Sequence, residues 1–522
     1  MENFNLFIQR HFKISLVFFA IGLFFGLIYS INLLGYSIDS QILNPVNMRS
    51  IHISLMLYGF IPLMLSYLPF LLINKEVGFC NKGLHYLNLF TIFWYIFLIF
   101  MINSLLFGEN RGLAFYDFAY ELNFILAIAG VFYIIALFKF IKQYKVLPLW
   151  IKVCLRVVII APIALLILMN PIIGQVERTV SGPHGDNALG MSLALIPIYY
   201  LIIKLLNNGS FKARWNIFWI IPTIFYFSSV LYRIFLEPLT YNQEWFLQYL
   251  TLLYIPLLYR WYKDSNIEIF SKSALFISIF AFLFVDVEGN IIFIPQIRWI
   301  FHRNDLVVGH AHVAMGICIF FMLIAMFTPY IKKLNTNTNF IRFYLFAILG
   351  IFFVLSISGF AQAGIIQIST NTLWIFRSIF GLLALCSLLY LVSFKTNFSL
   401  LQKYNLIAVL ADGMGGIMLI LLASYLYPLF GFSFTAKYEY IVFAFVCMTG
   451  LIHFLALIYK EHEEILSKLT VMIRVFISSI FFSLYVSNSL GIEALLICAF
   501  DIFYALVYLL YFYKEPLCKK LP

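Results

Sequence analysis

The feature that most constrains this chain is a succession of apolar runs, each long enough to cross a lipid bilayer as a helix. Crossing the hydrocarbon core takes about 20 apolar residues, and the sequence holds sixteen runs of about this length. Within lipid the backbone must satisfy its own hydrogen bonds, which restricts spanning segments to helices and closed barrels. We therefore predict an all-α, polytopic transmembrane helix bundle. Its helices are expected at residues 13–34, 51–73, 86–107, 121–141, 149–170, 188–206, 215–237, 246–262, 271–291, 306–328, 341–363, 372–394, 404–429, 439–459, 469–487 and 492–513.

The composition of the chain agrees with a membrane protein and argues against a nucleic-acid-binding one. Of the 522 residues, 63% are hydrophobic and 11% are charged, whereas soluble proteins average about 25% charged residues. The net charge of +11 does not form a basic binding face, because the charges lie in short connections between the apolar runs. We expect lipid, and no nucleic acid, as the partner of most of the surface.

The distribution of Lys and Arg predicts the orientation of the chain. These residues gather in alternate connections, such as the one with Lys139 and Lys142, while the opposite connections hold few, such as Arg49. Arg474, near the beginning of the run 469–487, is counted with the richer side. Because the richer side is normally cytoplasmic, we predict an integral protein of a bacterial inner (cytoplasmic) membrane with both termini in the cytoplasm.

Three histidines lie at similar predicted depth inside the apolar runs. His52 stands near the beginning of the second run, and His310 and His312 stand near the beginning of the tenth. Even-numbered runs enter from the same, non-cytoplasmic side, so the three imidazoles are expected near that face. A histidine within the bilayer is costly and usually functional, and neutral imidazole is a normal axial ligand of haem iron.

The spacing of His310 and His312 suits two metal centres better than one. At about 100° per residue, side chains two residues apart point to opposite sides of a helix. Each can therefore hold a separate haem, and His52 can supply the second axial ligand of one of them. This arrangement predicts two b-type haems, one low-spin with two imidazoles and one high-spin with one. The alternative is that the three histidines are polar residues hydrogen-bonded between helices.

Any haem in this chain must be bound without a covalent attachment. None of the seven cysteines belongs to a Cys-x-x-Cys pair, so neither a c-type haem site nor a structural zinc site is expected. Electrons would then come from partners, which we expect to be c-type cytochrome subunits or another respiratory electron donor.

Longer stretches around these histidines resemble subunit I of the haem–copper oxidases. The closest similarity is to the catalytic subunit of the cbb-type (C-family) cytochrome c oxidase, followed by the large subunit of nitric oxide reductase. The resemblance covers residues from about 10 to 395. It is carried by NMRSIHISLMLYGF (47–60), HGDNALG (184–190), VEGN (287–290), HRND (302–305) leading into GHAHVAMG (309–316), and GFAQAGIIQ (359–367).

The resemblance implies a role for each matching residue. His310 corresponds to the proximal ligand of the high-spin haem, while His52 and His312 correspond to the axial ligands of the low-spin haem. His184 corresponds to a copper ligand, although a histidine facing water at the end of a loop is an equal alternative. Tyr226 matches the active-site tyrosine, and Glu288 matches a residue near the high-spin haem.

One departure from the family concerns copper. The family has an adjacent His-His pair on helix 7, where this chain reads Tyr232-Arg233. Because copper prefers several imidazoles, a residual site formed by His184 would bind it poorly, and we expect a copper-free distal site. Arg233 is expected either to pair with a propionate or with Glu237, or to lie at the interface at the end of the helix.

These features lead to a prediction of domains and function. Residues 1–400 are expected to form a core like subunit I of the haem–copper oxidases, and residues 401–522 add transmembrane helices of unassigned role. The predicted function is that of a haem-binding respiratory-chain oxidoreductase subunit, related to cytochrome c oxidase subunit I, that passes electrons from a low-spin to a high-spin haem and on to oxygen or another small molecule. One alternative is a haem-bearing electron-transfer or assembly subunit without terminal oxidase activity. A second is a secondary transporter.

Overall fold

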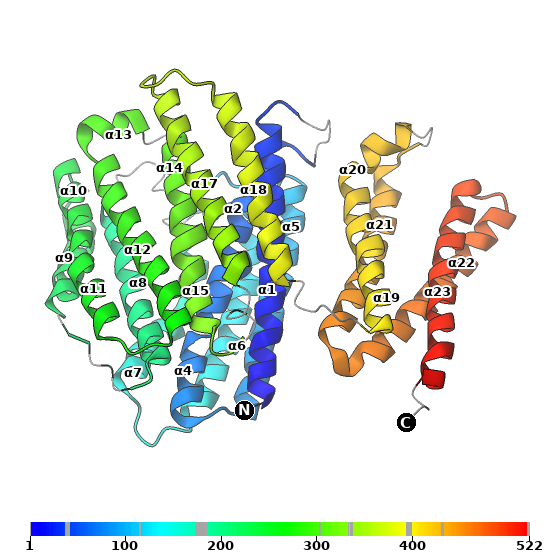
Figure 1. Ribbon diagram of the computed structural model, residues 1–522, viewed down its shortest axis with the longest axis horizontal. Coiled ribbons are helices and arrows are strands. Elements are labelled where there is room, and N and C mark those ends of the chain that lie inside the picture. The colour runs from blue at the N-terminus through cyan, green and yellow to red at the C-terminus, as the bar shows by residue number, and fades with distance from the viewer. Residues whose placement is uncertain are drawn as a thin grey trace. The chain divides into compact units, whose positions relative to one another are not determined.

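The computed structural model shows a helical membrane protein (Figure 1). No β-strand occurs among the residues that it describes. These are residues 2–36, 42–113, 116–172, 185–209, 211, 213–214, 216–301, 304–331, 334, 338–392, 399–429 and 433–518.

The predicted all-α membrane bundle is confirmed. Every one of the sixteen apolar runs coincides with helix, and fourteen of the helices are long and apolar enough to span a membrane. The two exceptions are neighbours in the sequence. The apolar part of the seventh is shorter, Ile217–Arg233, and the eighth is interrupted by a 3-10 turn, η3 (Leu250–Leu253).

The chain divides into two compact units. Unit 1 consists of Met1–Ser37 and Asn44–Phe394, and unit 2 consists of Ile38–Leu43 and Lys395–Pro522. The helices of unit 1 are α1 (Glu2–Asn32), α2 (Pro45–Leu55), η1 (Met56–Phe60), α3 (Ile61–Ser66), α4 (Leu68–Val77), α5 (Asn81–Leu106), η2 (Tyr120–Leu122), α6 (Asn123–Ile141), α7 (Leu149–Leu168), α8 (Gly185–Leu206), α9 (Ile217–Phe235), α10 (Tyr241–Tyr249), η3, α11 (Tyr254–Asp264), α12 (Ile269–Ile292), α13 (Pro295–Phe301), α14 (Asp305–His312), η4 (Val313–Ile319), α15 (Phe320–Phe327), α17 (Thr338–Gln362) and α18 (Thr370–Val392). Those of unit 2 are α19 (Leu400–Ala408), η5 (Val409–Met414), α20 (Gly415–Leu429), α21 (Ala436–Ile458), η6 (Lys460–His462), α22 (Glu463–Val486) and α23 (Ile492–Cys518).

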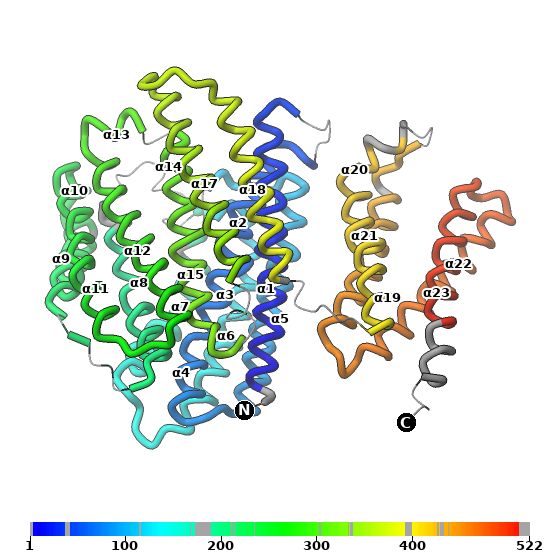
Figure 2. The backbone as a smooth tube through the Cα atoms, viewed as in Figure 1, coloured from blue at the N-terminus to red at the C-terminus, as the bar shows by residue number. Residues whose placement is uncertain are grey.

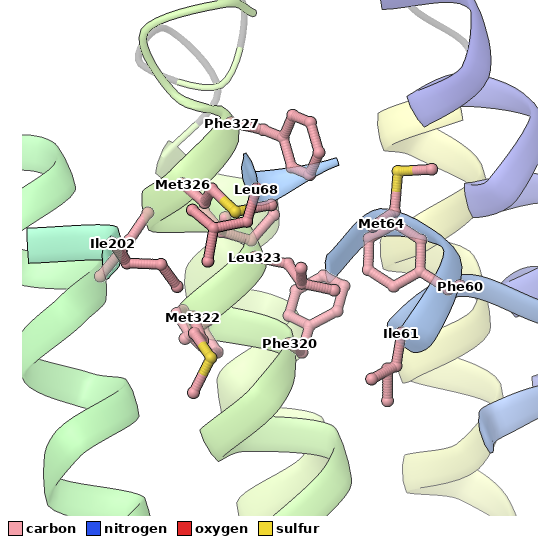
Figure 3. Packing of buried hydrophobic residues seen from close by; sticks show 14 of the residues in the cluster. Phe60, Ile61, Met64, Leu68, Ile202, Phe320, Met322, Leu323, Met326 and Phe327 are labelled. Atoms are coloured by element: carbon pink, nitrogen blue, oxygen red, sulfur yellow. The ribbon is translucent and has the colours of Figure 1, made fainter. Parts of the chain in front are cut away.

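The helix formed by α14, η4 and α15 is the centre of unit 1. Every residue of α15 is fully buried, as expected for a helix that is apolar on all sides and surrounded by others. It packs between α12 and α3, and α14 packs on α17 (Figure 2). Figure 3 shows part of the resulting core, in which the ring of Phe320 of α15 lies 6.0 Å from that of Phe60 of the second span.

The outermost helices of unit 1 present apolar side chains outward. In α7 only 6% of the spanning window is buried, and Val157, Ile160 and Ile163 are largely exposed. Exposed apolar surface of this extent on a spanning helix contacts lipid. The protein is therefore an integral membrane protein with lipid as its surroundings.

Candidate functional site

The three predicted histidines occupy regular helix immediately before π-helical turns. His52 lies near the end of α2, which continues into the π-turn η1, and His312 is the last residue of α14 before the π-turn η4. π-turns insert an extra residue into a helix and occur frequently at functional sites. Because α14 is regular as far as His312, the side chains of His310 and His312 leave the helix on different sides.

His52 and His312 face each other across the contact between the second span and the central helix. Their ring centres are 6.3 Å apart, with an angle of 26° between the ring planes. The Nδ1 of His52 donates to the carbonyl of Gly22 at 2.9 Å, and the Nδ1 of His312 donates to the carbonyl of Val308 at 2.8 Å. A carbonyl can only accept, so both rings carry their proton on Nδ1 and leave Nε2 as a potential metal ligand.

The spacing of this pair suits a bis-imidazole haem. An iron ion between two imidazoles lies about 2 Å from one nitrogen of each, and each ring centre lies roughly 1 Å beyond that nitrogen, so the ring centres are expected roughly 6 Å apart. The observed 6.3 Å meets this requirement. Both rings are only half-buried, so open space remains beside them. The residues present therefore fit a haem iron held between His52 and His312.

Two glycines of α1 hold the His52 ring in place. Gly22 provides the carbonyl that accepts from Nδ1, and Gly26 lies so close that a Cβ there would stand 2.5 Å from the same nitrogen. No side chain larger than hydrogen fits between α1 and the imidazole. These glycines of the first span therefore belong to the site, although the sequence alone did not identify them.

We expect Gly26→Ala to displace the His52 ring and to weaken haem binding. Overpacking of this kind costs about 1–3 kcal/mol, and the occupancy of a haem held between His52 and His312 should fall to less than about half of its wild-type value, since ligand orientation governs affinity. The haem-to-protein ratio and thermal unfolding of the purified variant measure both effects. Gly381→Ala is the control, because its Cβ would meet only Leu27 at an ordinary 3.8 Å. Equal haem content in the two variants would show that the ring position is unimportant.

His310 faces away from this pair and toward α12. Its Nδ1 donates to Glu288 Oε2 at 3.2 Å, and the side chains of His310 and Glu288 are 25% and 15% exposed. Gly289 of the same helix lies beside the ring, where a Cβ would meet its Cε1 at an ordinary contact distance of 3.6 Å. A carboxylate on Nδ1 orients the imidazole and increases the basicity of Nε2. The structure thus brings together His310 and Glu288, as two members of one site.

A charged network beside the His52–His312 pair was missed by the sequence analysis. Arg377 of α18 donates from Nε to Ser30 at 3.0 Å, and its guanidinium stacks on Trp374 at 5.2 Å. Trp374 Nε1 donates to Asp305 Oδ2 at 2.8 Å. The Nη2 of Arg377 is buried without a hydrogen-bond partner among the described residues, and Arg377 acts electrostatically on both imidazoles of the pair.

A half-buried guanidinium with an unused, buried donor is a candidate site for an anion. The haem propionates are such anions, so Arg377 is a candidate to bind one of them. The sequence could have identified Arg377, because it is a charged residue inside the apolar run 372–394. An ionisable residue within a membrane span is usually functional.

The remaining predicted residues lie elsewhere or outside the described chain. Tyr226 of α9 rests against Gly190 of α8, where a Cβ would come within 2.7 Å of its ring. Arg233 is exposed near the end of α9, which agrees with the interfacial alternative. The neighbouring Tyr232 donates from its hydroxyl to Glu237 Oε1 at 2.6 Å. His184 lies outside the described residues, as do His302 and Arg303 of the HRND stretch.

Within the part of the chain that the structure describes, no group of three or more His, Cys, Asp or Glu side chains is placed to hold a metal ion by itself.

No protein-family model matches this sequence, and no curated protein matches it. The geometry of the histidines therefore carries the functional argument.

Proposed function

We propose that unit 1 is the haem-binding core of a membrane oxidoreductase of the respiratory chain. It would hold two b-type haems, a low-spin haem between His52 and His312 and a high-spin haem on His310. The observation that carries the proposal is the 6.3 Å separation of two imidazoles whose Nδ1 atoms both donate to backbone carbonyls. That arrangement leaves two Nε2 atoms ready for one iron.

The two sides of α14 would have different tasks. A haem supplies reversible one-electron chemistry when bound, and its axial ligands decide whether a small molecule can also bind the iron. His52 and His312 together would close both axial positions, which suits electron transfer. His310 would close only one position, and Glu288 would hold its ring in a single orientation. Since only one residue separates His310 from His312, electrons would have a short path between the two sites.

Buried polar groups on α12 support a reaction that takes up protons. Ser192 Oγ donates to Asp286 Oδ1 at 2.8 Å, and Asn290 Nδ2 donates to Thr251 Oγ1 at 3.2 Å. One oxygen of Asp286 and the side-chain oxygen of Asn290 are buried without partners among the described residues. Bound water commonly satisfies such groups, and water here would place exchangeable protons on α12, the same helix that carries Glu288.

A spectrum of the purified chain tests this proposal. Reduced-minus-oxidised absorption and a pyridine haemochrome assay should show two b-type haems per chain, one six-coordinate and one open to carbon monoxide. A chain purified from haem-sufficient cells with no haem, or with a single one, would overturn it. Absence of haem would instead favour the transporter alternative.

A second candidate function is a haem-bearing electron-transfer or assembly subunit without terminal oxidase activity. It is favoured by Tyr232 and Arg233, which replace the expected His-His pair at a point where Arg233 is exposed near the helix end. We expect metal analysis to find iron at two per chain and copper far below one per chain. Stoichiometric copper, with oxidase activity that is lost when the copper is removed, would contradict this prediction and favour the first candidate.

A further inference from the structure

Unit 2 buries a charged triad in the spanning parts of its helices. Arg474 lies in α22, Asp412 in the π-turn η5 and Asp501 in α23. The guanidinium donates from Nη1 to Asp501 Oδ1 at 2.6 Å and from Nη2 to Asp412 Oδ2. The three side chains are only 2%, 4% and 13% exposed for Arg474, Asp412 and Asp501 respectively. The prediction that placed Arg474 with the cytoplasmic connections was wrong, because buried partners stabilise its charge inside the bundle.

The triad holds one more acidic group than basic groups. With both carboxylates ionised, its net charge is negative in surroundings of low dielectric constant, which is unfavourable. Tyr404, Cys447, His453 and Tyr504 lie within electrostatic reach of the triad. None of these carries a permanent positive charge, so a single added proton makes the site neutral.

A chain of polar and aromatic side chains leads away from the triad. The guanidinium lies over the ring of Tyr504 at 4.5 Å, and the ring of Tyr404 lies 6.4 Å from Tyr504 and 5.4 Å from His453. His453 Nδ1 then meets Asn405 Oδ1 at 2.8 Å, and Ser467 Oγ donates to the same oxygen at 3.1 Å. Together these groups form a continuous set of neighbours from the triad to Ser467.

This row of side chains, which begins at the triad, ends at Asn405 and Ser467, toward the membrane face predicted to be cytoplasmic. Asn405 precedes Asp412 by seven residues, and Ser467 precedes Arg474 by seven residues. Seven residues of helix rise about 10 Å, so the chain covers a substantial part of one bilayer leaflet. Lys403 and Lys468 stand beside its outer end, where positive charge is expected on the cytoplasmic side.

Several buried polar atoms along this row of side chains have no partner in the described part of the protein. They are His453 Nε2, Asn405 Nδ2 and Arg474 Nε, which are buried without hydrogen-bond partners among the described residues. His453 itself has no exposed surface. Buried polar atoms of this kind are normally satisfied by ordered water, and water molecules at these points would join the side chains into a proton-conducting chain.

Close packing of two helices fixes Asp412 beside Arg474. A Cβ at Gly450 of α21 would collide with the backbone of Gly413 and approach Asp412 C at 3.0 Å. Small residues that permit such contact are typical of helix interfaces in membranes. The π-turn η5 and the close contact of Gly413 with Gly450 together position the Asp412 carboxylate beside the Arg474 guanidinium.

We propose that unit 2 is a proton-conducting module in which the triad of Asp412, Arg474 and Asp501 binds one proton, exchanged with the cytoplasmic side through Tyr404, His453, Asn405 and Ser467. Loading forms one O–H bond on a carboxylate of the triad, and unloading breaks it. A metal cation suits the site less well, because hard cations require several free oxygen ligands and the guanidinium already occupies both carboxylates.

Proton flux into vesicles tests the proposal. The full-length protein is reconstituted into phosphatidylcholine–phosphatidylglycerol vesicles that contain a pH-sensitive dye, and a potassium diffusion potential drives protons inward. Asp412→Asn and Asp501→Asn should each reduce the flux at least about tenfold. Each substitution leaves Arg474 with one carboxylate, so neither variant buries an unpaired charge. Glu464→Gln, on the exposed surface of α22, is the matched control and should conduct like the wild type.

Two further measurements separate proton conduction from a purely structural ion pair. In infrared spectra, the wild type should show the carbonyl stretch of a protonated buried carboxyl group, and Asp412→Asn or Asp501→Asn should remove it. His453→Gln should slow the flux while this band remains. Wild-type flux in both Asp variants, two ionised carboxylates in the wild type at neutral pH, or flux carried by sodium would overturn the proposal. Because the driving force is an imposed potential, the outcome does not depend on haem binding in unit 1.

Discussion

Replacing His52 with Ala is expected to remove the low-spin haem and to leave the other haem in place. The His52 ring lies 6.3 Å from that of His312, and His312 alone cannot provide both axial ligands. The absorption of six-coordinate haem b should fall by at least about tenfold, and the haem content should fall from two to one per chain. Difference spectra and a pyridine haemochrome assay on the purified variant measure both changes.

The control for this substitution is another histidine of unit 1. His85 of α5 is exposed, and His85→Ala should keep both haems. His312→Ala should reproduce the loss seen with His52→Ala, because the two rings would serve the same iron. If His52→Ala keeps its six-coordinate spectrum, the pair does not hold a haem. Loss of both haems together with early thermal unfolding would show a folding defect instead, and His52→Gly with added imidazole would then test ligation directly.

His310→Ala is expected to abolish carbon monoxide binding while the six-coordinate spectrum persists. Carbon monoxide needs an open axial position, which only the haem on His310 would have. Its residual binding should be less than about one tenth of the wild-type amount, measured by flash photolysis of the reduced, carbon monoxide-treated protein. Survival of carbon monoxide binding here, and its loss in His312→Ala, would reverse the assignment of the two histidines.

Glu288→Gln keeps His310 as the proposed haem ligand and removes only the negative charge of the carboxylate that accepts from its Nδ1. The amide still accepts from Nδ1 but has no negative charge, so it stabilises positive charge at the iron less well. We expect carbon monoxide binding to remain and the midpoint potential of the high-spin haem to rise. An unchanged potential would mean that the contact of 3.2 Å has no electronic effect.

The sequence determined the helical fold because the membrane leaves few choices. Backbone groups in lipid must form their hydrogen bonds within their own segment. Each of the sixteen apolar runs could therefore be predicted as a helix without knowing which other helices it packs against. The divergence of His310 and His312 was also predictable, since it depends only on the turn of one helix. These inferences are local, and the structure agrees with both.

Burial could not be predicted in the same way. Half of the spanning window Asp305–Phe327 is buried, but only 6% of the window Leu149–Ile167, although both are strongly apolar. A membrane helix faces lipid or protein with similar side chains, because lipid is as apolar as a protein core. Hydrophobicity therefore does not reveal which helix lies at the centre.

Only the tertiary structure decided which polar groups meet. The packing of α1 against α2 places the Gly22 carbonyl at His52. The packing of α18 against α1 brings Arg377, which is distant in the sequence, to Ser30 of the same helix. In unit 2, Arg474 pairs with two carboxylates that lie on two other helices. The sequence suggested a residue at the surface, but Arg474 is the most deeply buried cation in the described part of that unit. A buried charge is stable only beside its partners, and contacts between distant helices, not the sequence around each residue, determine those partners.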